Sequence, residues 1–366
     1  MNRYFGHKVL VTGGTGFIGG RLAERLAVEE GARVRVLVHD WRKAAWVSRA
    51  NIELIQGAVT EIESLGRAIQ GCDTVFHCVG VGGTYEHCKR VNVDGTRNVI
   101  ESAISEHVEK IVYLSTIAVH GPNPPDNANE KDEFRRFGTP YGDSKIAAEE
   151  LVWSYRREKN IPVAVIRPTF IWGPGSPSFT IWPIQLMKAN RWFLIDNGKG
   201  TCHANYIDNL VDAILLAGIK KEAIGEAFLL KDDPPCTWSD FFGYYARMVG
   251  RNEFPSISSK SYKIEIDRFA RKYVNYFSSV LEKMNNTPTS ESARTFSRGM
   301  RFGLKLFRKP MRTFVLPFDS WDILKYSRIG RLDTSKISNL LGYHPRISRE
   351  NGMKETESWL RNQNIL

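Results

Sequence analysis

The fold is decided by Lys8-Val9-Leu10-Val11-Thr12-Gly13-Gly14-Thr15-Gly16-Phe17-Ile18-Gly19, residues 8–19. A short apolar run enters a glycine-rich loop, and a helix-forming stretch leaves it. In this context the glycines let backbone N–H groups approach a pyrophosphate at the positive end of a helix. The spacing fits both G-x-x-G-x-x-G and G-x-G-x-x-G, so it does not choose between them. The expected phosphate-binding residues are Gly13, Gly16, Phe17, Ile18 and Gly19.

Beyond this loop, short β-branched runs alternate with amphipathic helical stretches, which is the pattern of β-α-β units. The predicted strands are 8–12, 34–38, 52–56, 74–78, 110–115 and 163–167. The predicted helices are 17–29, 61–69, 91–106 and 207–217. We therefore expect an α/β protein with a doubly wound parallel sheet, the Rossmann arrangement, and a smaller C-terminal substrate domain.

The boundary between these two parts follows from a turn-rich exit from the sixth strand, 168–175. We expect a dinucleotide-binding domain over 1–172, with a return segment at about 204–230. The substrate-binding domain then takes 173–203 and 231–366.

Composition is that of an ordinary globular protein, because 42% of the 366 residues are hydrophobic and 25% are charged. The five cysteines are odd in number and form no C-x-x-C pair, so we expect buried small side chains and neither a disulfide framework nor a metal site. No apolar run of about 18 residues is present, and residues 1–7 lead into a strand without a signal-peptide pattern. A cytoplasmic location is the expectation.

The formal charge of +11 is concentrated in one region, since residues 256–331 hold 16 Lys and Arg against 6 Asp and Glu. Within it, six basic residues recur at steps of three and four and share one helical stripe in the segment 294–312. They are Arg294, Arg298, Arg301, Lys305, Arg308 and Arg312. Three interpretations stay open, namely a solvated face, contact with an anionic membrane surface, and closure over an anionic substrate. No nucleic-acid-binding module accompanies the charge.

Tyr141 and Lys145 are four residues apart, so a helix places them on one face. A tyrosine hydroxyl has an ordinary pKa near 10 and acts as a base near neutral pH only beside positive charge, which a lysine one turn away can supply. Ser115 and Thr116 end the fifth predicted strand, at the sheet edge where ligands bind.

The order of glycine loop, strand-end hydroxyl and Y-x-x-x-K resembles the short-chain dehydrogenase/reductase superfamily. Together with the motifs at 91–96 and 166–174, it is similar to the extended branch: the NAD-dependent epimerase/dehydratase and 3β-hydroxysteroid dehydrogenase-like proteins. The resemblance implies that Tyr141 is the proton-transfer acid/base and that Lys145 lowers its pKa and holds the nicotinamide ribose. It also implies that Thr116 bonds the reacting oxygen, supported by Ser115, and that Pro168 lies at the cofactor.

Cofactor choice depends on the end of the second strand, where an acidic residue takes the ribose hydroxyls of NAD. The preferred register puts Val38 there, beside His39, Arg42 and Lys43, and predicts NADP. A slip of two residues makes Asp40 the ribose ligand and predicts NAD. Ala58 and Val59 replace the family's frequent aspartate, so adenine contacts would come from their backbone.

Two departures from the family narrow the reaction. Ile117-Ala118 follow Thr116 where the family's 4,6-dehydratases have an Asp-Glu pair, and the absence of these carboxylates disfavours elimination of water. In addition, the segment 202–206 lacks the arginine that commonly holds a sugar-nucleotide diphosphate. We expect an NAD(P)-dependent oxidoreductase or epimerase that moves hydride at a secondary hydroxyl or carbonyl carbon of a nucleotide-linked sugar. The alternative is a hydroxysteroid-like enzyme on a steroid or lipid-like alcohol. A non-catalytic dinucleotide sensor fits less well, because Thr116, Tyr141 and Lys145 are intact.

His120 and His203 fall near the expected site, but tyrosine chemistry makes a catalytic histidine unnecessary. The expected partner is a small-molecule substrate, and a homodimer is left open.

Overall fold

The computed structural model describes residues 2–45, 47–232, 234–262 and 318–366. The basic segment 294–312 lies outside these residues, so its expected helical stripe of basic residues stays a prediction.

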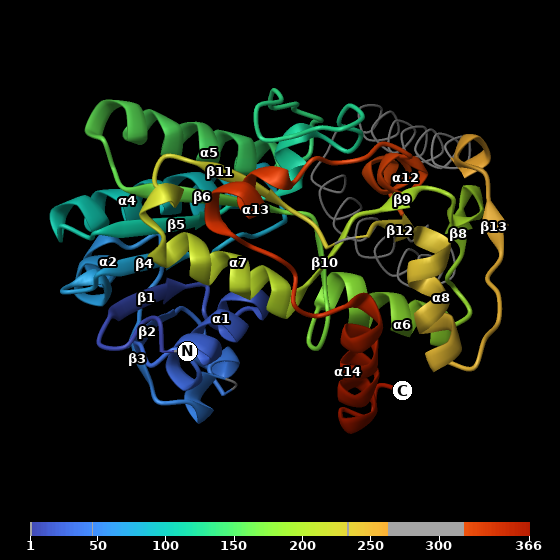
Figure 1. Ribbon diagram of the computed structural model, residues 1–366, viewed down its shortest axis with the longest axis horizontal. Coiled ribbons are helices and arrows are strands. Elements are labelled where there is room, and N and C mark those ends of the chain that lie inside the picture. Colours follow the sequence, from blue (N-terminus) through green and yellow to red (C-terminus); the bar gives the residue numbers. More distant parts are fainter. Residues whose placement is uncertain (1, 46, 233, 263–317) are drawn as a thin grey trace, which may run out of the picture.

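A seven-stranded parallel sheet forms one half of the molecule (Figure 1). In spatial order its strands are β11 (Ala227–Leu230), β6 (Val163–Pro168), β5 (Lys110–Leu114), β4 (Thr74–His77), β1 (Lys8–Thr12), β2 (Arg33–Val38) and β3 (Ile52–Gln56). The order runs outward in opposite directions from β1 and β4, which creates a topological switch point at their carboxyl ends. The predicted Rossmann arrangement is confirmed.

The edge strand β11 is the difference from the predicted sheet. Its four residues, Ala-Phe-Leu-Leu, are buried and pair in parallel with β6, as in Phe228 opposite Ile166. A run this short carries no periodicity of its own, so the sequence does not distinguish it from the end of a helix.

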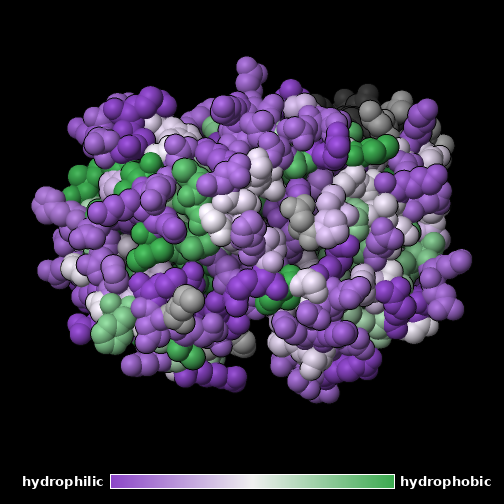
Figure 2. Space-filling view, in the orientation of Figure 1, coloured by the Kyte–Doolittle hydropathy of each residue, from purple (hydrophilic) through white to green (hydrophobic). Residues whose placement is uncertain are grey.

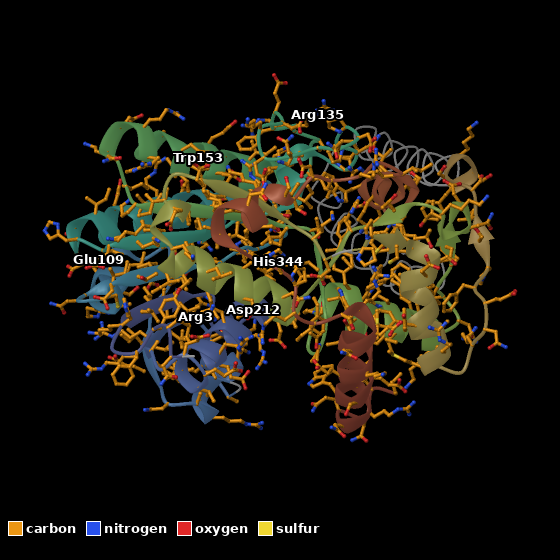
Figure 3. The ribbon with its side chains drawn as sticks, in the orientation of Figure 1. Arg3, Glu109, Arg135, Trp153, Asp212 and His344 are labelled. Carbon is orange, nitrogen blue, oxygen red and sulfur yellow. The ribbon has the colours of Figure 1, made fainter. Side chains whose placement is uncertain are left out.

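Helices cover both faces of the sheet. One face carries α1 (Phe17–Val28) and α7 (Ile207–Ile219), and the other carries α2 (Ile62–Ile69), α4 (Gly95–Ser105) and α5 (Pro140–Lys159). Polar contacts reinforce the first layer, because Asp212 of α7, labelled in Figure 3, accepts from Arg25 of α1 at 2.9 Å.

The predicted helix 91–106 begins differently from the expectation. The short helix α3 (Tyr85–Cys88) runs into a wide π turn, η3 (Lys89–Asp94), and only then into α4. The Asn92 side chain bonds both the backbone N–H and the carbonyl of Val81, each at 2.9 Å, which fixes this turn beside the sheet edge.

The second half is built from short strand pairs and helices. Strand β7 (Phe170–Trp172) pairs with β10 (Ala204–Tyr206), β9 (Thr201–Cys202) with β12 (Cys236–Thr237), and β8 (Leu194–Ile195) with β13 (Ser256–Ile257). Its helices are α6 (Trp182–Lys188), α8 (Trp238–Met248), α12 (Ser320–Ser327) and α14 (Arg349–Asn362), whereas α13 (Ser335–Leu341) packs on strand β11 of the parallel sheet. Aromatic rings fill their common core, and Trp238 stacks on Phe242 with centroids 5.4 Å apart.

The visible surface is largely hydrophilic, with hydrophobic side chains gathered mostly over the half that contains the sheet (Figure 2). Among the described residues, none of the helices combines the length and the apolar character needed to cross a membrane.

Candidate active site

The glycine loop joins β1 to α1 as a tight turn. Gly13 has φ +72°, and the N–H of Gly16 donates to its carbonyl at 2.9 Å. A Cβ atom at Gly19 would lie 2.4 Å from that same carbonyl oxygen, so the first turn of α1 reaches this position only without a side chain. The loop therefore keeps its backbone bare at the start of a helix, which suits a pyrophosphate.

A cavity of about 480 Å³ opens at the carboxyl ends of β1, β4, β5 and β6, where the switch point lies. Its wall brings together residues that are far apart in the sequence. The predicted site residues that line it are Phe17, Ile18, Ser115, Thr116, Tyr141, Lys145 and Pro168.

Helix α5 positions the tyrosine and the lysine. Pro140 occupies its first turn, where a missing N–H costs nothing, and Tyr141 and Lys145 follow one turn apart. The lysine is 1% exposed, and its Nζ donates to Tyr113 Oη at 2.7 Å and to the Leu114 carbonyl at 2.9 Å. Burial lowers the pKa of Lys145 to about 8, even though nearby Glu149 acts in the opposite direction.

Thr116 lines the same cavity and lies beside Tyr141 of α5. It caps the short helix η4 (Ile117–His120), and its Oγ1 accepts from the Ala118 N–H at 3.2 Å. Burial raises the pKa of Tyr141, and a hydrogen bond with Thr116 partly opposes that shift. The tyrosine is therefore protonated at neutral pH, which is the state that can give a proton to a carbonyl oxygen.

Ser115 points into a different environment from that of Thr116. Its hydroxyl donates to Glu149, a fully buried carboxylate that also receives Trp153 Nε1 at 3.0 Å and Arg167 Nε at 2.9 Å (Trp153 is labelled in Figure 3). Since its proton is used in this network, Ser115 supports the wall behind Thr116. Glu149 belongs to no motif from which it could be predicted, and a charged Arg167 inside a buried strand was the available signal for such a partner.

The side chains of the two histidines near the site, His120 and His203, form hydrogen bonds within the protein. Arg167 donates to His120 Nε2 at 3.1 Å, so the ring proton is on Nδ1, which faces the Glu133 carbonyl at 3.3 Å. Burial, followed by the charge of Arg167, lowers the pKa of His120 to about 4. His203 Nε2 donates to the Gly330 carbonyl at 2.9 Å.

The residues at the end of β2 are those from which the choice between NADP and NAD was predicted. Val38 is fully buried in the core and cannot reach a ribose. Asp40 caps the short helix η1 (Trp41–Lys43), and both of its oxygens accept from the Arg42 guanidinium at 2.9 Å, which lowers the pKa of Asp40 to about 2. His39, Arg42 and Lys43 are exposed beside it.

Ala58 and Val59, the residues expected to contact adenine, are buried. Their backbone is partly engaged within the protein, because the Ala58 N–H donates to Ser64 Oγ at 3.2 Å and the Val59 carbonyl accepts from Asn98 at 2.9 Å.

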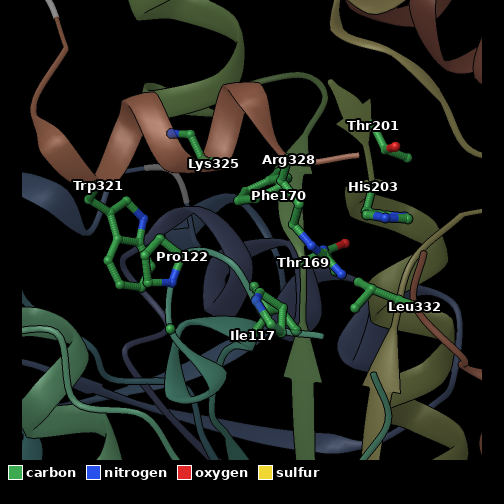
Figure 4. A pocket seen from close by; sticks show the side chains of 12 residues that line it. Ile117, Pro122, Thr169, Phe170, Thr201, His203, Trp321, Lys325, Arg328 and Leu332 are labelled. Atoms are coloured by element: carbon green, nitrogen blue, oxygen red, sulfur yellow. The ribbon is translucent and has the colours of Figure 1, made fainter. Parts of the chain in front are cut away.

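A smaller cavity of about 20 Å³ continues from the main one toward α12 (Figure 4). The two share Ile117, Thr169, Phe170, Trp321 and Lys325, and the smaller one also contacts Arg328. Lys325 is paired with Asp322 at 2.5 Å. Arg328 is 8% exposed and forms no salt bridge with a described carboxylate, and its Nε has no hydrogen-bond partner among the described residues. Neither residue was predicted from the sequence, since both lie far along the chain from the motifs of the site.

This fold, with its loop and cavity, defines an enzyme of the dinucleotide-binding Rossmann class that acts on CH–OH groups. A model of the NAD dependent epimerase/dehydratase family matches residues 9–229, and the chain belongs to that family. The resemblance stated from the sequence is confirmed.

Several known proteins are similar to this chain. A 4-hydroxy-2-methyl-3-oxo-4-farnesyl-3,4-dihydroquinoline-1-oxide ketoreductase of Stigmatella aurantiaca is 30% identical over 64% of this chain and 71% of its own length. A 3 beta-hydroxysteroid dehydrogenase/Delta 5-->4-isomerase of Mycobacterium tuberculosis is 28% identical over 64% and 67%. The UDP-glucuronic acid 4-epimerase of Bacillus cereus, solved with NAD, has a TM-score of 0.71 at 18% identity, covers 97% of this chain and 99% of its own, and shares the fold.

Proposed function

We propose that this protein is an NAD(P)-dependent oxidoreductase that interconverts a secondary alcohol and a ketone on an apolar, steroid-like or lipid-like substrate. One observation carries the choice of substrate class: the cavity that contains the proposed catalytic side chains also has an apolar, mostly aromatic group in its lining. This group is Ile117, Phe170, Ile171, Phe179 and Trp321. The ketoreductase and steroid dehydrogenase relatives act, by their names, on molecules of this kind.

The chemistry divides between the cofactor and the protein. When bound, the cofactor supplies or accepts hydride at its nicotinamide ring. In the reductive direction Tyr141 donates its proton to the substrate oxygen, and the Thr116 hydroxyl bonds the same oxygen and orients the carbonyl. Lys145 would hold the nicotinamide ribose with its ammonium group, and the bare loop at Gly13 and Gly19 would hold the pyrophosphate. Ser115 supports this arrangement through Glu149.

The cofactor in this proposal is NADP in preference to NAD. Arg42 is held by Asp40 in a two-point ion pair, and Lys43 and His39 add positive charge or hydrogen-bond donors to a 2′-phosphate. Fluorescence titration should show tighter binding of NADPH than of NADH, and Arg42→Ala should reduce the difference. Tighter binding of NADH, lost in Asp40→Ala, would instead make Asp40 the ribose ligand.

A direct experiment compares substrate classes. Purified protein with NADPH is screened by thermal shift, and then by cofactor absorbance, against hydroxysteroids, long-chain 3-oxo compounds and nucleotide sugars. Ligands that bind only the folded protein raise Tm in proportion to RT ln(1 + [L]/Kd). We expect stabilisation and turnover with the apolar ketones. Turnover confined to nucleotide sugars would overturn the proposed substrate class.

The sequence-based expectation of a nucleotide-linked sugar stays a second candidate, because a specific observation favours it. Arg328 and Lys325 place buried positive charge at the end of the cavity, where a diphosphate could replace the contact that segment 202–206 lacks. In that case Arg328→Gln should abolish the effect of nucleotide sugars on Tm. On a neutral steroid, the same substitution should leave KM within a few-fold of wild type.

A further inference from the structure

Cys202 and Cys236 are placed directly opposite each other on two antiparallel strands. Strands β9 and β12 pair with Cys202 facing Cys236 and Thr201 facing Thr237. Directly opposed residues on such strands have Cα atoms about 4.5 or 5.5 Å apart, and their side chains share one face of the pair. Both separations fall within the range of about 4.4–6.8 Å that a disulfide spans.

The two thiols are in contact and differ in their surroundings. Cys202 is 1% exposed, whereas Cys236 is partly exposed to solvent. A hydrogen bond between the thiols and the charge of nearby Arg349 lower the pKa of Cys236, and burial raises that of Cys202. Such a pair has an accessible sulfur to react first and a second sulfur within reach to complete the reaction.

The other cysteines lack this arrangement. Cys72 donates to the Ala68 carbonyl and Cys88 to the Val81 carbonyl, so each is bonded to local backbone. Cys78 follows β4 at the main cavity. Among the strand pairs that the structure describes, only β9 and β12 set one cysteine against another.

We propose that Cys202 and Cys236 are a reversible dithiol–disulfide site that exchanges with low-molecular-weight disulfides such as oxidised glutathione. The Cys236 thiolate attacks one sulfur of the reagent, whose S–S bond breaks and releases one thiolate. The Cys202 thiol gives its proton to solvent and attacks the Cys236 sulfur, which releases the second thiolate. Two protein thiols are oxidised, and one small disulfide is reduced to two thiols.

The bond would lie behind the wall of the smaller cavity. Thr201 and His203, on either side of Cys202, line that cavity, and Cys236 leads directly into α8. Oxidation would therefore join the strand behind the cavity to the entry of a helix in the aromatic core, and leave the glycine loop untouched.

The test uses native protein equilibrated with defined ratios of oxidised to reduced glutathione, then quenched in acid, alkylated and digested with trypsin without reductant. Each cysteine of the pair falls in its own tryptic peptide, 200–220 and 232–247. We expect these peptides joined, with a mass about 2 Da below their sum because two hydrogens are lost. Dithiothreitol should separate them, and thiols titrated after unfolding should fall from five to three.

Matched variants show which sulfur reacts first with the reagent and which one completes the disulfide. Cys202→Ser should stop at a glutathione adduct on Cys236, Cys236→Ser should show neither product, and Cys88→Ser should form the cross-link like wild type. Five titratable thiols at every ratio in wild type would overturn the proposal, as would a wild-type adduct on Cys236 without the cross-link.

Discussion

Tyr141 is the side chain on which the proposed chemistry depends most directly. Replacing it by phenylalanine removes the proton that the ketone oxygen needs, while the ring still fills the cavity wall. We expect turnover with the best substrate to fall by about 10²–10⁴, the usual contribution of a general acid or base. NADPH affinity, measured by fluorescence titration, should stay within about twofold of wild type.

Tyr155 provides the matched control for that substitution. It lies on the same helix, but its hydroxyl donates to Glu101 at 2.6 Å on the exposed side. Tyr155→Phe should keep the wild-type rate. Equal activity of Tyr141→Phe and Tyr155→Phe would remove Tyr141 from the mechanism.

Lys145 should give dinucleotide binding a pH dependence. Burial lowers its pKa to about 8, so the ammonium group loses its proton as pH rises through that value. If the ammonium holds the nicotinamide ribose, the Kd of NADPH should rise by up to about tenfold per pH unit above pH 8 and stay flat below it. Titrations from pH 6 to 10 check this, and in Lys145→Ala binding should be weak and should lose the break near pH 8. A break that persists in the variant would assign the titration to another group.

Site residues can be predicted from the sequence where a local motif carries them. The glycine loop, the strand-end threonine and Y-x-x-x-K each have a spacing, so the sequence alone predicts that Thr116, Tyr141 and Lys145 lie together at one edge of the sheet. Tyr113, which bonds Lys145, and Arg328, at the far end of the cavity, have no such spacing. They come together only through strand pairing and the packing of α12, which a linear pattern does not encode.

At the scale of elements, the buried ion pair of Glu149 and Arg167 joins α5 to β6. Both side chains are at most 4% exposed, and the hydrogen bond from Ser115 extends the link to the end of β5. Removing one partner leaves a buried charge uncompensated. We expect Glu149→Gln to lower the free energy of unfolding in urea by about 3–5 kcal/mol.

The neighbouring residue supplies the control. Glu150 pairs with Arg136 on the surface, with both side chains about half exposed. Glu150→Gln should cost about 0–1 kcal/mol, because solvent screens an exposed pair. A similar loss in both variants would show that the buried network does not anchor α5.

Helices and strands could be predicted where hydrophobic period and turn residues agree. The six predicted strands agree with the structure to within one residue at each end. The π turn at Lys89–Asp94 could not be predicted, because it depends on bonds from Asn92 to the backbone of Val81, eleven residues away. Strand β11 could not be predicted from its own residues, because only its pairing with β6 identifies it as a strand.

At the scale of the whole molecule, the uneven charge predicts a behaviour that no single site explains. The spacing of the six basic residues between 294 and 312 predicts one helical stripe, and each could contribute about 1 kcal/mol near an anionic membrane. We expect the protein to co-sediment with anionic vesicles at low salt and not with neutral ones. Salt should weaken the binding, and so should changing Arg298, Arg301 and Lys305 to Glu. Absence of co-sedimentation at low salt would contradict membrane contact.

The last strand to join the sheet has a consequence for biosynthesis. Strand β11 covers the edge of β6, yet between them the chain travels out through β7, β9 and β10 and returns along α7. A ribosome must therefore complete residue 230 before the sheet can close, and until then β6, buried along its whole length in the finished protein, has one unpaired edge. A truncated protein that ends at residue 172 would lack β11 altogether, so one edge of β6 would stay unpaired. We expect this truncated protein to accumulate in inclusion bodies.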